Sequence, residues 1–480
     1  MICKNDKKTL ALYSGLALLF IYPLIQSGVF YRDDLDRAIT GQYGWRGLGR
    51  PVADILMKIL SASGHYNLDL FPYTMIMSCL FIGASSLLLK KHLTRMDVPY
   101  PVFVAAFLIF NPYMLQNIAY RYDSIGMALA FFLAVLAYTY SDKNLIRKVS
   151  IKIVTGVLAL TLYQPCANIF IGLLAVDVVI FGLKNHSGKH QSTKLIARKA
   201  CEFISFYIVY MLLFSTKSNS RSELITPDIY GYRTLVSTVK DLHALVASYF
   251  HGPVYIYFLI PVLFIILFLI KDSVQKNKPF VSTSILIILS IFIFLISLLG
   301  PTIFLHDAPT FPRTLVSFSV LLVIISISIV ELAPKLKYLA LIPLITTFAF
   351  SAQLSSAMKS QREYECFVFN MISRDIINHS NVKLIGTTGQ VNINERARLL
   401  MDNKPLIGYF LSPASEFLAS FQLINKGLPQ TLHGYGDEQS NKNKLAYIVG
   451  KGIKPFSSNK DYSLYFLDDE VIVSLGNNKN

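Results

Sequence analysis

The sequence has little charge, a single tryptophan and few cysteines. Charged residues make up 15% of its 480 positions and hydrophobic residues 53%, whereas a soluble globular domain carries about 25% charged residues. The five cysteines have neither the spacing of a metal site nor a paired disulfide framework. Together with a mean hydropathy of +0.48, this composition indicates a polytopic membrane protein.

The motifs of several soluble enzyme classes are also missing. There is no HExxH or GxSxG motif, and Gly44, Gly47 and Gly49 lack the spacing and the strand-to-helix context of a phosphate loop. The net charge of +16 is compatible with nucleic-acid binding. However, most basic residues lie in short connections between apolar runs, which is the pattern that sets membrane orientation. We therefore expect membrane lipids, and no nucleic acid, among the partners.

What the chain does have is a series of long apolar runs. A membrane helix needs about 20 apolar residues. We predict an all-α polytopic membrane protein with interfacial helices, formed by residues 1–351 as a bundle of about 11 transmembrane helices. The predicted spans lie near 10–29, 72–89, 98–116, 125–140, 153–164, 168–183, 200–215, 254–270, 281–300, 314–331 and 338–351. Pro165 predicts a break between the fifth and sixth spans.

Lysine and arginine predict the orientation of these spans. Basic clusters alternate with segments that hold fewer basic residues; they lie at 4–8, 90–95, 143–152, 184–199, 271–278 and 335–337. The positive-inside rule then places the N-terminus in the cytoplasm and the tail outside. No small-x-small cleavage site precedes Phe30, so the first run predicts a retained anchor. Outer loops are expected at 30–71 and 217–252, each with an amphipathic helix lying in the membrane surface.

The tail, residues 352–480, is less apolar and predicts a small soluble α/β or α+β domain. A helix is expected at 358–379. Strands are expected at 382–385, where residues 386–389 end the strand, and at 445–449. Residues 462–467 and 471–475 predict a hairpin.

The chain is organised around Phe30–Arg37, which directly follows the first apolar run. This stretch holds three carboxylates, Asp33, Asp34 and Asp36, and two guanidiniums, Arg32 and Arg37. Charge at the edge of hydrocarbon is costly unless it is paired or hydrated, so such clusters often mark function. The like charges of Asp33 and Asp34 raise the pKa of one carboxyl, which suits a proton acceptor. We expect both to border water; the structural alternative is a solvated helix end.

Other polar residues at the expected outer face are candidates for substrate binding. Trp45, Arg50 and Asp123 are candidate substrate contacts, and Arg121 and Arg313 lie at the outer ends of two spans. With Arg32 and Arg37, these two arginines are candidates for binding a donor phosphate. The alternatives are an interfacial anchor for Trp45, an ion pair between Arg121 and Asp123, and snorkelling of Arg313. The arginines beside the three aspartates count against a divalent cation, and we expect no cofactor.

Carboxylates and arginines at a lipid boundary suit the transfer of a group from a lipid phosphate. The carboxylate accepts the proton of the acceptor hydroxyl, and the guanidiniums stabilise the departing phosphate. Soluble nucleotide sugars are not present outside the cytoplasm, so a lipid carrier is required there. This chemistry predicts a transferase that uses a lipid-phosphate donor.

The chain also resembles a known family. The stretch Phe30–Arg37, followed by Gly44-Trp45 and Gly49-Arg50-Pro51, is similar to bacterial O-antigen glucosyltransferases of serotype-converting phages, of the Gtr type II kind. The similarity continues through residues 110–113, 121–124 and 162–165. It covers much of the membrane part; the tail shows no match.

The resemblance implies a GT-C type enzyme in the bacterial inner membrane, acting on the periplasmic side. It implies undecaprenyl-phosphate-glucose as donor and a lipid-linked O-antigen repeat as acceptor. It also implies a functional link to a flippase and to a donor synthase. In such enzymes an acidic residue of the first outer loop is the candidate base. Asp33 or Asp34 matches that position, and Asp36 matches it less well.

Two alternatives remain open. A transporter or flippase of polyprenyl-linked glycan would carry charges inside its spans, whereas most acids here lie in the expected outer loops. An O-antigen polymerase or ligase would also face outward and would carry an arginine-rich loop late in the chain.

Overall fold

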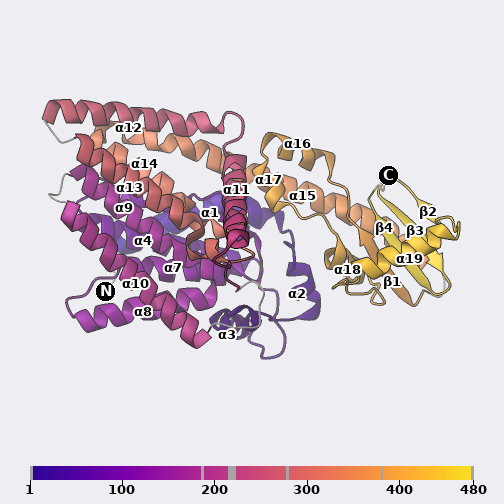
Figure 1. The fold of residues 1–480 in the computed structure, drawn as a ribbon. Coiled ribbons are helices and arrows are strands. Elements are labelled where there is room, and N and C mark those ends of the chain that lie inside the picture. The colour runs from indigo at the N-terminus through magenta and orange to yellow at the C-terminus, as the bar shows by residue number, and fades with distance from the viewer. Residues whose placement is uncertain (1–3, 185–188, 215–222, 277–279, 380–381, 477–480) are drawn as a thin grey trace. The chain divides into compact units, whose positions relative to one another are not determined.

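A computed structural model describes residues 4–184, 189–214, 223–276, 280–379 and 382–476 (Figure 1). Residues 217–222, at the start of the expected second loop, and the last residues 477–480 lie outside this range. The chain divides into two compact units. The membrane unit comprises Met1–Gln26, Gly44–Ala62 and Leu70–Ala352, and the tail unit comprises Ser27–Tyr43, Ser63–Asp69 and Gln353–Asn480.

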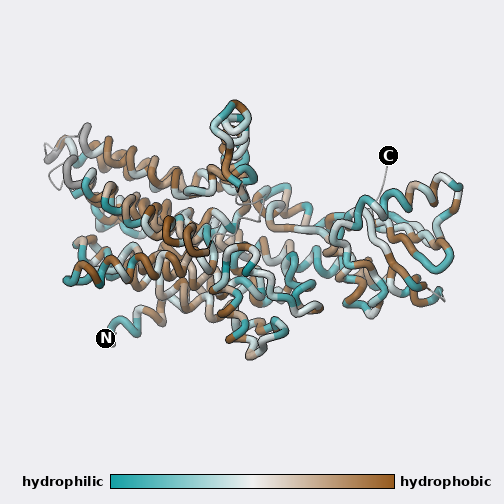
Figure 2. The backbone as a smooth tube through the Cα atoms, turned by 60° about the horizontal axis from the view of Figure 1, so that its bottom comes forward, coloured by the Kyte–Doolittle hydropathy of each residue, from teal (hydrophilic) through white to brown (hydrophobic). Residues whose placement is uncertain are grey.

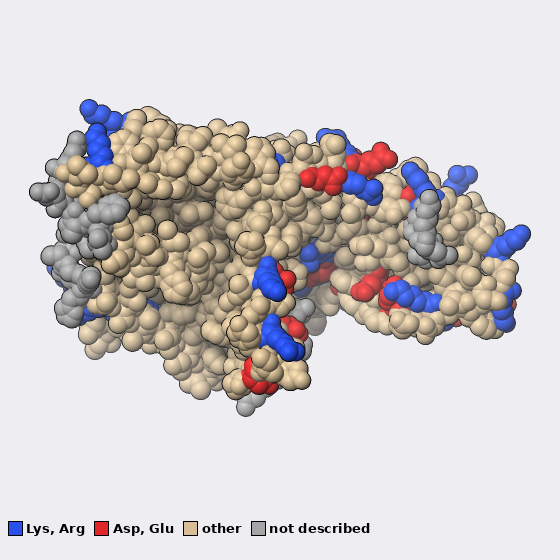
Figure 3. Space-filling view, turned by 45° about the horizontal axis from the view of Figure 1, so that its top comes forward, with Lys and Arg blue, Asp and Glu red and all other residues tan. Residues whose placement is uncertain are grey.

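The membrane unit consists of helices. They are α1 (Lys4–Ser27), α3 (Pro51–Leu60), α4 (Tyr73–Arg95), α5 (Pro101–Ala106), α6 (Leu115–Ala119), α7 (Ser124–Thr139), α8 (Leu145–Leu162), α9 (Ile169–Lys184), α10 (Lys189–Phe214), α11 (Ile229–Tyr249), α12 (Val254–Lys276), α13 (Phe280–Leu299), α14 (Ser319–Leu332) and the first part of α15 (Ile342–Ile377). Long hydrophobic stretches follow these helices (Figure 2), and Figure 3 shows a face of the unit with few charged side chains.

By length and composition, six segments among the described residues could cross a membrane. They are Asn5–Ser27, Tyr73–Arg95, Gln164–Lys184, Val254–Val274, Thr283–Phe304 and Pro334–Ile377. Membrane character is therefore supported, but the expected number of about 11 spans is not confirmed. The predicted break at Pro165 is confirmed: α8 ends at Leu162, and a 3₁₀ turn, Gln164–Asn168, precedes α9.

The expected single helix at 98–116 is wrong. Helix α5 ends at Ala106, a 3₁₀ turn covers Phe107–Ile109, and α6 begins only at Leu115. The interruption follows from Asn111-Pro112, because proline has no backbone donor and the residue before it avoids the helical region. The Asn111 amide donates to the Leu315 and Val316 carbonyls at 3.0 and 2.9 Å and its oxygen accepts from Tyr113 N at 3.0 Å.

The two expected amphipathic helices are present. Helix α3 begins at Pro51, in the first helical turn where proline is tolerated. Its apolar stripe includes Ile55 and Ile59, which are 46% and 70% exposed, while Met57 is buried. Helix α11 holds the second stripe. Whether these helices lie in a membrane surface stays a prediction.

The tail unit is a mixed α/β domain around a four-stranded sheet of order β1-β4-β3-β2. Strand β1 (Leu384–Gly389) pairs in parallel with β4 (Glu470–Leu475), and β3 (Tyr462–Leu467) is antiparallel to both β4 and β2 (Ser457–Ser458). The described helices of this unit are α2 (Asp34–Thr40), the end of α15, α16 (Glu395–Asn403), α17 (Leu406–Phe410), α18 (Glu416–Asn425) and α19 (Glu438–Gly450). Its core joins the end of α15 to the sheet through residues such as Phe369, Ile372, Ile385 and Val473.

The secondary-structure predictions for the tail had mixed outcomes. The predicted hairpin is confirmed as β3 and β4. The strand expected at 445–449 is wrong, because this apolar run is the end of the 13-residue helix α19. Residues 386–389 do not end the first strand but form most of β1, where Thr387 and Thr388 are buried. The helix expected at 358–379 is the second part of α15.

Candidate active site

The acidic segment, residues 30–37, belongs to the tail unit. Asp33 precedes α2 and Asp34 is its first residue, so the carboxylates lie where a helix dipole favours negative charge. Arg32 has φ 49°, in the left-handed region that costs a non-glycine residue energy. Gly41 caps the end of α2 with φ 67°, and a Cβ there would lie 2.7 Å from the Tyr66 ring. The segment is therefore held in one defined conformation.

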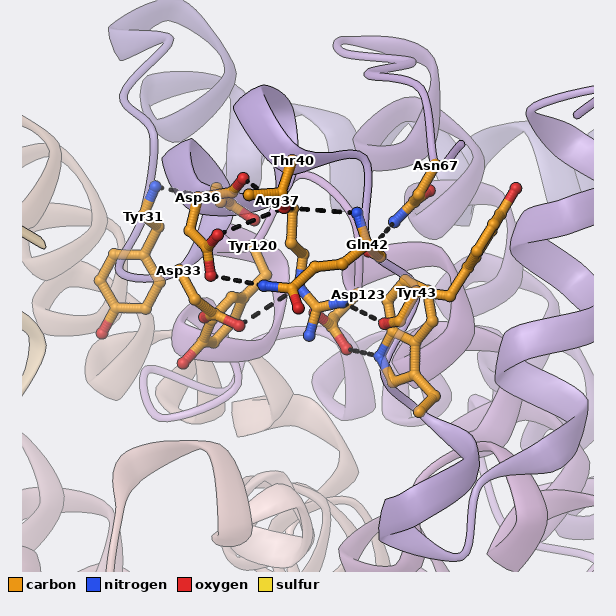
Figure 4. Close-up of polar contacts among 12 residues, drawn as sticks. Tyr31, Asp33, Asp36, Arg37, Thr40, Gln42, Tyr43, Asn67, Tyr120 and Asp123 are labelled. Atoms are coloured by element: carbon orange, nitrogen blue, oxygen red, sulfur yellow. Dashed lines mark hydrogen bonds and ion pairs between the residues drawn. The ribbon is translucent and has the colours of Figure 1, made fainter. Parts of the chain in front are cut away.

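The three candidate carboxylates have different environments; Figure 4 shows Asp33 and Asp36 with their polar contacts. The Asp33 side chain is 36% exposed, and its Oδ2 lies 3.2 Å from Arg37 Nε. Asp34 is fully buried, and its Oδ2 accepts a hydrogen bond from Tyr31 N at 3.0 Å. The expectation that Asp34 borders water is therefore wrong. It fails because the first turn of α2 is packed inside the tail unit, which leaves Asp33 as the accessible member of the pair.

Asp36 is 3% exposed and surrounded by donors. Its Oδ2 accepts from Gln42 Nε2 at 2.6 Å and from the Tyr435 hydroxyl, and Thr40 Oγ1 lies 3.3 Å from its Oδ1. Burial of the hydroxyl and the Asp36 charge raise the pKa of Tyr435. The Tyr435 hydroxyl thus remains a hydrogen-bond donor. Because the oxygens of Asp36 already accept hydrogen bonds, this carboxylate is better suited to positioning than to proton transfer.

The two arginines of the acidic segment hold it together. Arg37 is 9% exposed and donates to Asp33 and to the Tyr43 carbonyl. Arg32 Nε donates to the Tyr31 hydroxyl at 3.3 Å. Loop residues close the arrangement: the Asn67 amide donates to the Gln42 carbonyl at 3.4 Å. Arg37 therefore has a positioning role within the tail unit.

A second set of candidates lies in the membrane unit; we call Trp45, Arg50, Asp123, Gln164 and Arg313 the arginine cluster. The buried Trp45 ring donates from Nε1 to Asp123 Oδ1 at 2.6 Å. Arg50 Nε donates to Gln164 Oε1 at 2.9 Å. The Gln164 amide in turn donates to the Leu48 carbonyl at 3.1 Å, which fixes the orientation of its side chain.

The electrostatics of this cluster favour an anion. Burial lowers the pKa of the Arg50 guanidinium, as does the charge of Arg313, while Asp123 raises it. An arginine remains charged in spite of this, because its pKa lies far above neutrality. The Arg50 guanidinium also lies 4.7 Å from the centre of the Tyr163 ring. The cluster thus combines two cations, Arg50 and Arg313, with one carboxylate, Asp123.

Arg313 and Arg121 come from adjacent segments. Arg313 Nη1 donates to the Tyr120 hydroxyl at 2.5 Å, and the residue after Tyr120 is Arg121. The Arg313 backbone is fixed by Gln116 and Asn117, at 2.9 and 3.1 Å. The Arg121 guanidinium lies 4.3 Å from the centre of the Phe71 ring, and the residue is 8% exposed. The structure therefore brings the segments that carry Arg121 and Arg313 together.

The candidates thus fall into two groups. Asp33, Asp34, Asp36, Arg32 and Arg37 share the tail unit, whereas Trp45, Arg50, Arg121, Asp123 and Arg313 share the membrane unit. Sequence reasoning assigned Gln164 only to a kink and overlooked Tyr435. The only sequence signal at Gln164 was its position before Pro165. Nothing in the sequence near Tyr435 indicated its hydrogen bond to Asp36, 399 positions away.

Sequence reasoning also overlooked a buried ionic network in the membrane unit. Asp177, on α9, lies 2.7 Å from His92 Nε2 and accepts from the Tyr138 hydroxyl at 2.5 Å. Lys199 Nζ lies 3.6 Å from the centre of the Tyr138 ring and 3.4 Å from Glu202. These charges are paired, as buried charges must be, and they tie α4, α7, α9 and α10 together.

No group of three or more His, Cys, Asp or Glu side chains suited to a metal ion occurs within the part of the chain that the structure describes. The fold and these residues define a helical membrane protein that has an arginine cluster in its membrane unit and an acidic segment in its α/β tail unit.

Comparison with known proteins gives the family. The model of the family "Glucosyl transferase GtrII" matches residues 22–330, so the chain belongs to this family. The chain is also 24% identical, over 418 residues, to an "Uncharacterized 55.3 kDa protein in gtrB 5'region" of Salmonella phage P22. That alignment covers 82% of this chain and 84% of the relative. No solved structure matches the chain. Family membership implies a glycosyltransferase and suggests O-antigen modification.

Proposed function

We propose that the protein transfers glucose from undecaprenyl phosphate to a lipid-linked O-antigen repeat on the periplasmic face of the inner membrane. The observation that carries this proposal is the arginine cluster, in which Arg50 and Arg313 act on one site beside Trp45 and Asp123. A membrane-embedded chain with such a cluster is suited to a lipid substrate whose head group bears a phosphate. This arrangement agrees with a glucosyltransferase of GT-C type.

The reaction assigns one role to each group. The oxygen of an acceptor hydroxyl bonds to the anomeric carbon of glucose, and the bond from that carbon to the phosphate oxygen breaks. The electron pair leaves with the polyprenyl phosphate, whose added charge is stabilised by the arginines. The hydroxyl proton passes to a carboxylate, for which Asp33 is the candidate because its side chain is 36% exposed and its ion pair with Arg37 holds it in position.

The test combines a cellular and an enzymatic measurement. Lipopolysaccharide glycan from cells with and without the gene should differ by one glucose per modified repeat. Membranes that contain the protein should move radiolabelled glucose from polyprenyl-phosphate-glucose to a lipid-linked O-antigen repeat. A flippase would move the labelled lipid across the membrane with no new glycosidic bond, and a polymerase or ligase would lengthen or relocate the glycan without adding glucose. Either result would refute the proposal.

A further inference from the structure

The tail unit contains a hollow whose chemistry differs from that of the arginine cluster. It is open to solvent, and the empty space in it and at its mouth together measures about 620 Å³, which is an upper bound on the space for a ligand. Its walls come from the acidic segment, the end of α15, the chain after α17, and α18. Every lining residue belongs to the tail unit, so the hollow is a property of that unit alone.

One buried acceptor that lines this hollow has no hydrogen-bond partner within the described part of the chain. Gln422 is 6% exposed and lines the hollow, and its Oε1 makes no hydrogen bond among the described residues. A buried polar atom without a partner costs about 1–3 kcal/mol, and such atoms are rare in native proteins. A ligand hydroxyl that donates to Oε1 would remove this cost. Gln422 therefore points to a ligand with hydroxyl groups.

Other polar groups that line the hollow are oriented in advance. Glu365 is 6% exposed, and its Oε1 accepts from the Gln361 amide and from Ala414 N, each at 3.0 Å. Gln361 is itself fixed, because its Oε1 accepts from Asn394 N at 2.9 Å. A carboxylate held by two donors can accept further hydrogen bonds, since each oxygen has two lone pairs. Fixed acceptors of this kind suit a polyhydroxylated ligand.

The charges of the hollow balance one another. Arg32 and Arg362 supply two positive charges, and Asp36 and Glu365 supply two negative ones. This balance contrasts with the arginine cluster, where the cations outnumber the carboxylate. A phosphate placed here would face two carboxylates as well as two arginines, so its charge would gain no net attraction, whereas a neutral sugar would find both donors and acceptors.

One wall of the hollow is aromatic. Phe417 lines it, and its ring stacks on Tyr435 with centroids 5.2 Å apart and planes 17° apart. Tyr435 donates to Asp36, so the stack is anchored to the acidic segment. A hexose has one face made of C–H groups, which packs on an aromatic ring while the hydroxyls at its edge remain free for hydrogen bonds.

From these features we infer that the hollow binds the neutral saccharide of the acceptor. The inference rests on the proposed function and deepens it: the membrane unit takes the phosphate-bearing donor, and the tail unit recognises the glycan that is modified. Because Asp36 and Arg32 of the acidic segment form part of the wall, a saccharide bound there lies against the segment that carries the candidate base.

The decisive variant is Gln422→Met. Replacing an unpartnered buried amide by an apolar side chain of similar size is neutral or stabilising for the fold. If Gln422 serves a ligand, the thermal midpoint of the full-length protein in nanodiscs should stay equal or rise. At the same time the KM for the lipid-linked acceptor should rise at least about tenfold, with the KM for polyprenyl-phosphate-glucose unchanged.

Binding is measured separately from catalysis by calorimetric titration with O-antigen polysaccharide freed of lipid by mild acid. Wild-type protein should bind it, and Gln422→Met and Phe417→Leu should bind it at least about tenfold more weakly. Gln439→Ala and Tyr447→Leu, on the exposed face of α19, are the matched controls and should bind as wild type does.

Unchanged saccharide affinity in both hollow variants would overturn the inference. So would a change confined to the binding of vesicles that contain undecaprenyl phosphate without sugar, which would assign the hollow to the lipid chain. If wild-type protein binds the polysaccharide through Gln422 but transfers no glucose, the proposed function fails and the saccharide site stands. If every variant transfers glucose with a normal KM for the acceptor, the proposed function stands and the saccharide site fails.

Discussion

Asp33→Asn should separate catalysis from stability. The Asp33 side chain is 36% exposed and its ion pair with Arg37 spans 3.2 Å, and pairs of this kind contribute about 0.2–1 kcal/mol. Asparagine keeps the size of the side chain, so the folded protein should lose less than about 1 kcal/mol. Loss of a general base, by contrast, reduces the rate by a factor of about 10² to 10⁴, which corresponds to about 3–5 kcal/mol of barrier.

Asp34→Asn provides the contrast within the same segment. Asp34 is fully buried and accepts from Tyr31 N. An asparagine oxygen can still accept that bond, but its amide group adds two donors at a site closed to water, at a cost of about 1–3 kcal/mol. We therefore expect Asp34→Asn to lower the amount of folded protein, with a much smaller effect on the rate per folded molecule.

The assay is the initial rate of glucose transfer in membranes, divided by the amount of folded protein in the monodisperse chromatographic peak. Asp402→Asn, an exposed carboxylate on α16, is the matched control and should be neutral. More than about a tenth of the wild-type rate in Asp33→Asn would refute the assignment of Asp33 as base. Full loss in Asp36→Asn alone, at normal folded protein levels, would transfer that role to Asp36.

Three further predictions concern binding of the donor phosphate, the membrane orientation of the chain, and the stability of residues 27–43. Arg313→Lys should keep part of the donor turnover and Arg313→Ala very little, because lysine supplies charge without the planar fork; full turnover in the Arg121→Ala, Arg313→Ala double variant would exclude both arginines from phosphate binding. A reporter active only outside the cytoplasm, fused at the C-terminus, should be active, as the alternating basic clusters predict; activity only of a cytoplasmic reporter would reverse this orientation. The raised pKa of Tyr435 means that the folded protein favours its protonated form. The contribution of Tyr435 to folding stability is therefore complete below the unfolded pKa of about 10, and it is lost only as the pH rises through the higher folded pKa. Hydrogen exchange of residues 27–43 should therefore show the same protection at pH 6 and pH 9 after correction for intrinsic rates, and faster exchange in Tyr435→Phe; a loss of protection by pH 9 in wild type would contradict this.

Local patterns predicted the local elements. The hairpin of β3 and β4 follows from two apolar stretches joined by a turn, and α3 follows from Pro51 and its apolar stripe. The run at 445–449 was misread because five consecutive apolar residues fit a strand and the end of a helix equally well. The break at Asn111-Pro112 was missed because the apolar residues around it continue past the proline, while the Asn111 amide bonds to carbonyls 204 and 205 positions away.

The sequence predicted the candidate residues by type, but it did not predict which residues they contact. A carboxylate and arginine stretch after an apolar run was visible in the sequence, and family resemblance added Trp45 and Arg50. That Asp34 is buried and Asp33 is not depends on how α2 packs, because neighbours in sequence lie on different sides of a helix. The bond from Trp45 to Asp123, 78 positions apart, and that from Tyr435 to Asp36 are tertiary and leave no local trace.

The division of the first loop bears on how relatives of this protein can recombine. Ser27–Tyr43 and Ser63–Asp69 fold with Gln353–Asn480, whereas Gly44–Ala62 between them folds with the membrane helices. The family match ends at residue 330 and so includes these loop segments but not the rest of their unit. A crossover that replaced only the end of the gene would set a foreign tail against a resident loop and break the contacts of Tyr435 with Asp36 and Gln42. A working chimera must therefore inherit all three segments from one parent.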